Sequence, residues 1–333
     1  MDQVRQTRPD IWVRAEESSA VGAVRRTATH LAESVGIGPE RVGQIAVAVT
    51  EAVSNLVKHA VQGMALVRPC PGAPAVVELI TLDRGPGMPD VARALRDGYS
   101  TSGTLGIGLG AIARFASHYD VHSVPGAGTA LAMQFADGDL PALPPASGLT
   151  RPIGEEVESG DSFAIATGDE ATTVMLCDGL GHGSLAARAS QEAVRLFLAA
   201  PDDDPAAILR RLHHGLGHTR GGAAAVARVT SDSVTYTGIG NISGWIVHDG
   251  QRQGMISAHG IAGHQGRRPR QYVYEVDEHA TVVLHSDGLT DRWSPAAMPG
   301  LFARSPAVVA ATLLREAGSR RDDAGVVIVR PRS

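Results

Sequence analysis

The chain has 333 residues, a length that predicts two domains at roughly 100–200 residues each. Hydrophobic residues make up 43% and charged residues 20% of the chain, so it can bury a core and is not a disordered protein. A net charge of −5 argues against a general nucleic-acid-binding protein, which carries a basic excess. The single lysine, Lys58, is followed by His59, so the chain has no Walker A loop, which needs Gly-Lys-Ser/Thr.

The cysteines and the apolar segments indicate where the protein works. Cys70 and Cys177 lie far apart and form neither a CxxC motif nor a zinc-binding spacing. The segment 1–10 has no apolar stretch of the signal-peptide kind, and no run of about 18 apolar residues occurs. We therefore expect a cytoplasmic protein that binds neither membranes nor nucleic acid.

The front part of the chain has an α+β pattern. A short strand is expected over 11–15, and apolar residues at helical spacing predict a helix over 18–35. Pro39 then begins a second helix, which runs to residue 60, because proline fits the first turn. The remaining elements are strands at 65–68, 76–82, 119–123 and 129–135 and a helix at 109–117.

A segment rich in proline and glycine divides the chain. Residues 138–152 have no helical or strand periodicity, which predicts a linker between a domain at 1–137 and a second at 153–333. The second domain is rich in strands, and we expect antiparallel hairpins covered by helices. Its strands are expected at 162–166, 173–177, 223–230, 233–238, 243–248, 272–276, 281–285 and 325–329, and its helices at 184–199, 205–216 and 306–317.

Three motifs of the front domain carry chemistry. Glu51 and Asn55 are four residues apart and share one face of the second helix, where they could hold Mg²⁺ and position a nucleophile. Asp83, at a strand end before Gly85 and Gly87, can accept a hydrogen bond from an adenine amino group. The glycine-rich segment 103–110 precedes a helix and could cradle phosphate. Taken singly, the first motif could be a polar helix face and the second a turn, and the glycine-rich segment alone is weak evidence because it does not fit the dinucleotide-binding fingerprint.

The order and spacing of the three motifs are more specific than any one of them. Together they resemble the N, G1 and G2 boxes of the GHKL ATPase fold, and more closely the RsbT and SpoIIAB type of anti-sigma serine kinase, over residues 11–135. The resemblance implies that Glu51 is the catalytic base, that Asn55 binds Mg²⁺ and that Asp83 binds adenine. It also implies a set of further ATP-binding residues, namely Lys58, Gly85, Gly87, Gly106, Gly108, Gly110 and Thr129.

The informative residues of the back domain are aspartates at strand ends. Asp178 and Asp287 each follow an apolar strand and precede glycine, whereas Asp161 and the pair Asp322-Asp323 each precede a strand. An aspartate beside glycine is typically either a turn former or a metal ligand. Because four such sites occur with almost no histidine or cysteine alongside, they predict oxygen ligands for a hard cation. Two such ions could activate water for attack on phosphorus.

These motifs, Gly-Asp, Asp-Gly-Leu-Gly-His-Gly, Ser-Asp-Gly and Asp-Asp, resemble the metal-dependent (PPM-type) protein Ser/Thr phosphatases in their SpoIIE and RsbX branch, over residues 153–330. The resemblance implies an αββα sandwich and two Mn²⁺ or Mg²⁺ ions, with no protein nucleophile. It implies a set of ligands, namely Asp161, Asp178, the Gly179 carbonyl, Asp287 and Asp322, with Asp323 competing for the last place. His182 could protonate the leaving group or order its loop, and no phosphate-binding arginine is evident ahead of Asp161.

The two resemblances together imply a partner-switching regulator. The protein is expected to bind ATP and to dephosphorylate, and also phosphorylate, Ser/Thr of a STAS-domain antagonist that controls a sigma factor or stress response, possible partners being a sigma factor or a stressosome component. One alternative is a front domain that binds ATP and the partner without transferring phosphate, so that the phosphatase is the only activity. A second alternative is a binding protein with neither activity.

Overall fold

The computed structural model describes residues 10–71, 73–94, 109–138, 140, 143–154, 156–264, 269–319 and 321–332. Contacts divide them into two units. The front unit consists of Ile11–Leu143 and Ala303–Arg315, and the back unit consists of Pro144–Phe302 and Glu316–Ser333 together with Asp10. Among the described helices, none is both long and apolar enough to cross a lipid bilayer.

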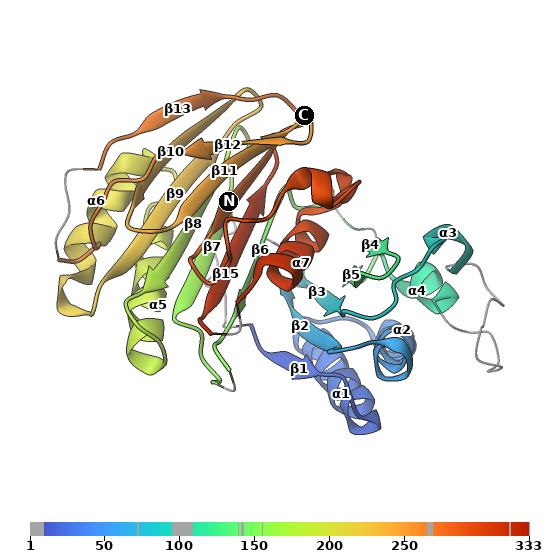
Figure 1. Cartoon of the computed structure of the whole chain (residues 1–333). Helices are drawn as coiled ribbons and strands as arrows, with labels where there is room; N and C mark the ends of the chain where they lie inside the picture. Colours follow the sequence, from blue (N-terminus) through green and yellow to red (C-terminus); the bar gives the residue numbers. More distant parts are fainter. Residues whose placement is uncertain are drawn as a thin grey trace. The chain divides into compact units, whose positions relative to one another are not determined.

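The front unit is a five-stranded antiparallel sheet with two long helices on one face (Figure 1). Its strands lie in the order β1-β2-β3-β5-β4. Their bounds are β1 (Trp12–Arg14), β2 (Met64–Cys70), β3 (Ala73–Leu82), β4 (His118–Val124) and β5 (Gly128–Phe135). The helices are α1 (Ser18–Ser34), α2 (Pro39–His59), α3 (Val91–Ala94) and α4 (Gly110–Phe115), and α7 (Pro306–Ala317) belongs to this unit up to Arg315.

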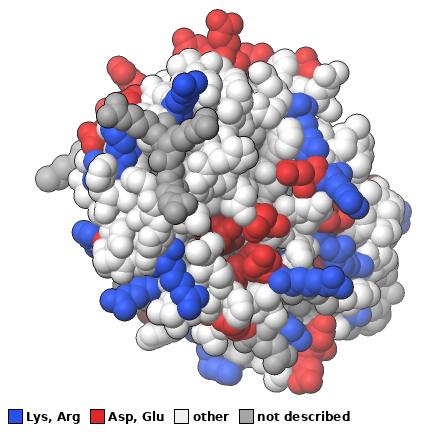
Figure 2. Space-filling model, turned by 60° about the vertical axis from the view of Figure 1, so that its left-hand side comes forward, with Lys and Arg blue, Asp and Glu red and all other residues white. Residues whose placement is uncertain are grey.

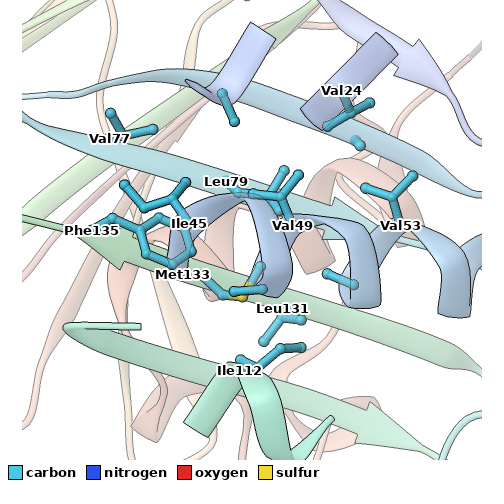
Figure 3. Close-up of a cluster of buried hydrophobic side chains, with 14 of the residues drawn as sticks. Val24, Ile45, Val49, Val53, Val77, Leu79, Ile112, Leu131, Met133 and Phe135 are labelled. Atoms are coloured by element: carbon cyan, nitrogen blue, oxygen red, sulfur yellow. The ribbon is translucent and has the colours of Figure 1, made fainter. Parts of the chain in front are cut away.

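The core of the front unit forms where the apolar stripe of α2 meets alternate residues of the sheet. Figure 3 shows Ile45, Val49 and Val53 of α2 over Leu79 of β3 and Met133 of β5. Because residues two apart in a strand share a face, β3 and β5 present every second side chain to these helices. This packing fixes α2 by one stripe and leaves its other faces free to carry polar residues.

The back unit contains two five-stranded antiparallel sheets. The first has the order β13-β10-β9-β8-β7 and the second the order β12-β11-β14-β15-β6. The first sheet comprises β7 (Asp161–Thr167), β8 (Thr172–Gly179), β9 (Gly222–Val229), β10 (Ser233–Ile239) and β13 (Tyr272–Glu275). The second comprises β6 (Ala146–Arg151), β11 (Ser243–His248), β12 (Gln251–Met255), β14 (Thr281–His285) and β15 (Ala324–Val329).

Each face of the first sheet has its own core. Phe163 and Leu176 pack with Leu284 and Val327 of the second sheet, which makes a sandwich. The opposite face is covered by α5 (Ser184–Leu198) and α6 (Pro205–Gly215), as Figure 1 also shows. The expected mixed α+β class, with one sandwich covered by helices, is therefore confirmed.

Every helix and strand expected from the sequence is present to within a few residues, and the structure adds α3, β6 and β12. The expected linker at 138–152 is wrong in part, because Ala146–Arg151 form β6, which pairs with β15. Gly148 suggested a linker, but in β6 it makes room for the ring of Phe163, which lies 2.7 Å from where a Cβ would sit. Small residues at this edge strand therefore reflect close packing of the sheets.

Candidate functional site

The acidic site of the back unit is set by the register of two neighbouring strands. Asp161 begins β7 and lies directly opposite Asp178, near the end of β8. Cross-strand partners have their side chains about 5 Å apart, so pairing of the two strands forces these carboxylates together. The remaining acids come from loops that follow or precede strands of the second sheet, Asp287 after β14 and Asp322 before β15.

Asp161 is the most deeply placed of these acids, with 2% of its surface exposed. One carboxylate oxygen, Oδ2, accepts a hydrogen bond from the hydroxyl of Ser286 at 2.5 Å. The other, Oδ1, is buried and has no hydrogen-bond partner among the described residues. A buried carboxylate oxygen without a partner is costly, so this atom favours a bound cation.

The acids raise one another's pKa values. Burial, and then the charges of Asp287 and Asp322, raise the pKa of Asp178 from 3.8 to about 7. Burial and the charge of Asp178 raise the pKa of Asp161 well above its ordinary range, and burial and Asp322 raise that of Asp287. A site whose carboxylates resist ionisation in this way is stabilised by divalent cations, which neutralise the charges.

The structure separates the roles of Asp322 and Asp323. The Asp323 carboxylate is 3% exposed and accepts backbone N–H groups of Ile153 and Gly160, each at 2.8 Å. Asp322 is half-buried, and its charge raises the pKa of Asp178. Among the described residues its carboxylate accepts only the N–H of Asp323, at 2.9 Å. Asp323 is thus occupied in holding two loops, which favours Asp322 as the ligand.

Gly179, whose carbonyl is a candidate ligand, is fixed by packing. A Cβ at this position would collide with the backbone of Ala186 in α5, and the Gly179 N–H donates to the Gly160 carbonyl at 3.1 Å. The sequence reasoning missed Asn241, whose amide donates to Asp287 Oδ2 at 2.6 Å. It also missed Ser286, although its position directly before Asp287 suggested a role. Both residues orient a carboxylate of the site.

The chemistry of these residues suits a divalent metal, but their side chains are not arranged around an ion in the structure. Within the described ranges, no three acidic, histidine or cysteine side chains already enclose an ion. Instead the charges of Asp287 and Asp322 act on Asp178, and the charge of Asp178 acts on Asp161. Asp161 Oδ1 is buried without a hydrogen-bond partner among the described residues, and the pKa values of the acids are raised, so bound cations would neutralise these charges. Asp161, Asp178, the Gly179 carbonyl, Asp287 and Asp322 would then hold them.

His182 and Cys177 flank the acidic site. The His182 ring is exposed and its Nδ1 lies 3.0 Å from Glu156 Oε1, a contact that orders the loop between Asp178 and α5. Cys177 is completely buried in β8, and burial raises the pKa of its thiol well above the ordinary range. A buried thiol that resists ionisation is not a nucleophile.

The front unit presents its candidate residues along one stripe of α2. Glu51, Asn55 and Lys58 follow one another at i, i+4 and i+7, away from the residues that pack on the sheet. None of the three side chains has a hydrogen bond or ion pair to another residue that the structure describes. The stripe is therefore available to a ligand.

Asp83 lies at the end of β3, next to Thr129 on β5. The Asp83 N–H donates to the Thr129 carbonyl at 2.9 Å, and Asp83 Oδ1 accepts the Gly85 N–H at 2.6 Å. Asp83 is 8% exposed, and burial raises its pKa. The Thr129 hydroxyl lies 2.8 Å from that of Ser123. The expected adenine-binding pair, Asp83 and Thr129, is thus brought together.

Close backbone approaches explain the glycines around Asp83. Gly87 has a φ of +65°, and a Cβ there would collide with the Val124 carbonyl. At Gly85 the nearest atom to a Cβ would be Asp83 Oδ1, at 2.8 Å. Gly110 is buried at the start of α4, and the other two predicted glycines of this motif, Gly106 and Gly108, lie outside the described residues.

The sequence reasoning missed Arg315, which belongs to the same unit. Arg315 is 3% exposed, its guanidinium donates to the Asp83 carbonyl at 3.1 Å, and its own carbonyl accepts from Arg84. Its separation of more than 200 residues from Asp83 in the chain hides this contact from motif reading.

Comparison with known proteins agrees with this geometry. Residues 13–135 match the family model of the histidine kinase-like ATPase domain, and residues 168–332 match that of stage II sporulation protein E (SpoIIE). The serine/threonine-protein kinase RsbT of Bacillus subtilis (strain 168) is 32% identical over 108 residues, which are 32% of this chain and 81% of RsbT. The phosphoserine phosphatase RsbX of the same organism is 26% identical over 135 residues, 39% of this chain and 67% of RsbX.

A solved structure from work on the bacterial stressosome supports the fold. It is described as part of a modular system adapted to control secondary messenger signaling, and it aligns with a TM-score of 0.52 at 24% identity, covering 56% of this chain and 98% of that one. The chain is homologous to both RsbT and RsbX. It belongs to the family of the RsbT kinase through a histidine kinase-like ATPase domain, which it joins to a SpoIIE-type phosphatase domain.

Proposed function

We propose that the back domain is a metal-dependent protein serine/threonine phosphatase. The observation that carries this proposal is the group of four carboxylates, Asp161, Asp178, Asp287 and Asp322, of which the deepest has an unpartnered buried oxygen. Such a site has the charge and the oxygen ligands that Mn²⁺ or Mg²⁺ requires. When bound, these ions would supply a Lewis acid that activates water at neutral pH.

The residues of the chain would prepare the site for this reaction. Ser286 and Asn241 orient Asp161 and Asp287 by hydrogen bonds of 2.5 and 2.6 Å. Asp323 holds the loops of Ile153 and Gly160 against the site. His182, exposed beside the site, could donate a proton to the departing serine oxygen, with Glu156 holding its ring.

The front domain, in this proposal, binds ATP with Mg²⁺ and transfers phosphate to a protein serine. Asp83 would accept the adenine amino group, Asn55 would bind Mg²⁺, and Glu51 would act as the base that takes the proton of the serine hydroxyl. The stripe of α2, whose side chains have no partner among the described residues, and the buried Asp83 beside Thr129 support these roles. The homologue RsbT, a serine/threonine-protein kinase, supports the reaction class.

We infer that both domains act on one partner, a STAS-domain antagonist in a partner-switching pathway, inside the cytoplasm. Homology of the two halves to a kinase and to a phosphoserine phosphatase supports opposed activities. Joining them in one chain raises the effective concentration of each at a shared partner.

The phosphatase is tested by hydrolysis of a phosphoserine peptide by the full chain, with Mn²⁺, with Mg²⁺ and with EDTA. We expect turnover with either ion and none with EDTA, and little hydrolysis of a phosphotyrosine peptide of the same sequence. Activity that survives EDTA, or its absence with both ions, contradicts the proposal. ATP binding by the same protein, without any phosphate transfer, would favour a front domain that is an ATP-dependent binding module.

A further inference from the structure

The acidic site needs a positive group for the phosphate, and the described arginines of the back unit differ in whether they are free to provide one. Several are occupied, for example Arg195 with Glu192 and Arg211 with Asp203. Arg220, in the loop before β9, is exposed and has no hydrogen bond or ion pair to any residue in the described ranges. An exposed guanidinium that is paired with no described residue is available to an incoming anion.

Sheet register places Arg220 beside the loop that carries the metal ligands. Gly179 pairs with Gly222 across β8 and β9, so the residues beyond them, Leu180 and Gly221, meet as the strands end. The Leu180 N–H donates to the Gly221 carbonyl at 3.0 Å. Arg220 therefore lies next to Gly181, with its guanidinium nitrogen 3.2 Å from where a Cβ of Gly181 would sit.

Hydrogen bonds hold the backbone on both sides of Arg220, although its side chain makes none with a described residue. The Thr219 hydroxyl donates to the Leu216 carbonyl at 2.7 Å and accepts the Gly221 N–H at 2.9 Å. The Thr219 carbonyl also contacts His264 Nε2 at 3.1 Å, and the Gly222 N–H donates to the Ala262 carbonyl at 3.1 Å. A guanidinium on a fixed backbone loses less freedom on binding than one on a mobile loop.

We propose that Arg220 is the phosphate-binding arginine of the phosphatase site, an inference that rests on the proposed function. The planar guanidinium can donate two parallel hydrogen bonds to phosphate oxygens, which lysine cannot match. The sequence shows no arginine for this task directly ahead of Asp161, and Arg220 reaches the site from a different loop. Figure 2 shows acidic side chains gathered in the middle of one face of the molecule, with basic side chains beside them.

The test measures binding of orthophosphate to the full-length, Mn²⁺-loaded protein by calorimetry, so that it does not depend on turnover. The variants are Arg220→Met, which removes the charge, and Arg220→Lys, which keeps the charge without the planar group. Arg210→Met is the matched control, because Arg210 is an equally exposed arginine on α6. Mn²⁺ binding and thermal unfolding of each variant show whether the site and the fold are retained.

We expect Arg220→Met to weaken orthophosphate binding about tenfold or more, the size of a charge-assisted hydrogen-bond pair. The lysine variant should recover part of the loss, and the Arg210 control should bind as the unchanged protein does. The KM for a phosphoserine peptide should rise in parallel, with a smaller change in kcat. Unchanged orthophosphate affinity in Arg220→Met, or no orthophosphate binding by the unchanged protein, overturns the assignment. If phosphate binds through Arg220 but no phosphopeptide is hydrolysed, the proposed function fails, and Arg220 remains a phosphate-binding residue without a role in a phosphatase.

Discussion

The acidic site of the back domain and the proposed nucleotide site of the front domain are built in different ways. In the back domain, sheet register and two loops bring buried carboxylates together, and each raises the pKa of another. In the front domain, the candidate residues are a partly exposed stripe on α2 and one buried aspartate, Asp83. The carboxylates of the first site act on one another by charge, whereas Glu51, Asn55 and Lys58 make no hydrogen bond or ion pair with any described residue.

Removing one carboxylate of the back site is expected to have the largest effect. Asp178→Asn should lower the rate of phosphoserine hydrolysis roughly a hundredfold to a thousandfold or more, because an amide cannot supply the charge that holds two cations. Steady-state kinetics with Mn²⁺ measures this. Asp202→Asn, at an exposed aspartate of the α5–α6 loop, is the control and should keep full activity. A fully active Asp178→Asn protein would remove the distinction between the two sites.

The front site should lose ligand affinity without any effect on the back site. Asp83→Ala is expected to weaken ATP binding about tenfold to a hundredfold, the scale of a hydrogen bond to a charged group. Calorimetry with ATP and Mg²⁺ measures the change, and Glu33→Ala on α1 is an exposed control. Hydrolysis of the phosphoserine peptide should not change. An equal affinity for ATP and GTP in the unchanged protein would argue against Asp83 as the adenine-binding residue.

Substitutions of the adjacent Asp322 and Asp323 should affect different quantities, phosphatase activity for the first and stability for the second. Asp323→Asn is expected to lower the free energy of unfolding by about 1–3 kcal/mol, because its carboxylate accepts two backbone N–H groups in a buried place. Asp322→Asn should leave stability nearly unchanged and abolish phosphatase activity. Urea unfolding and peptide hydrolysis, measured on both variants, decide between them. The reverse assignment of losses would make Asp323 the ligand.

The smallest effect concerns pH. Because the pKa of Asp178 is raised from 3.8 to about 7 by folding, the folded state holds a proton that the unfolded state has released. The stabilising contribution of this proton is fully present below about pH 3.8 and is lost as the pH rises through about 7. EDTA-treated protein should therefore unfold at lower urea concentration at pH 7.5 than at pH 5.5, with a free energy of unfolding lower by roughly 2 kcal/mol. Mn²⁺ should remove this loss, and Asp178→Asn should flatten the pH profile.

The sequence predicted most of the fold because apolar periodicity was strong wherever an element packs against a core, as in α2 and β8. It failed at β6, where glycine and proline suggested a linker and packing of Phe163 against Gly148 decided otherwise. Motifs predicted Asp161 and Asp178, because their positions at strand ends can be read from the sequence without knowing how the sheets pack. They could not predict Asn241, Arg315 or the role that we propose for Arg220, because these residues contact Asp287, Asp83 and the surroundings of Gly181 from distant parts of the chain.

The central claim, that the two domains act in opposition on one phosphoprotein, is tested most directly by phosphate transfer from labelled ATP to each STAS-domain protein of the same organism. With Asp178→Asn, we expect one such protein to accumulate phosphoserine, and with Glu51→Ala we expect none. The labelled protein should then lose its phosphate on addition of the Glu51→Ala protein with Mn²⁺. Label that forms on no STAS protein, or label on one protein and dephosphorylation only of another, would contradict the account.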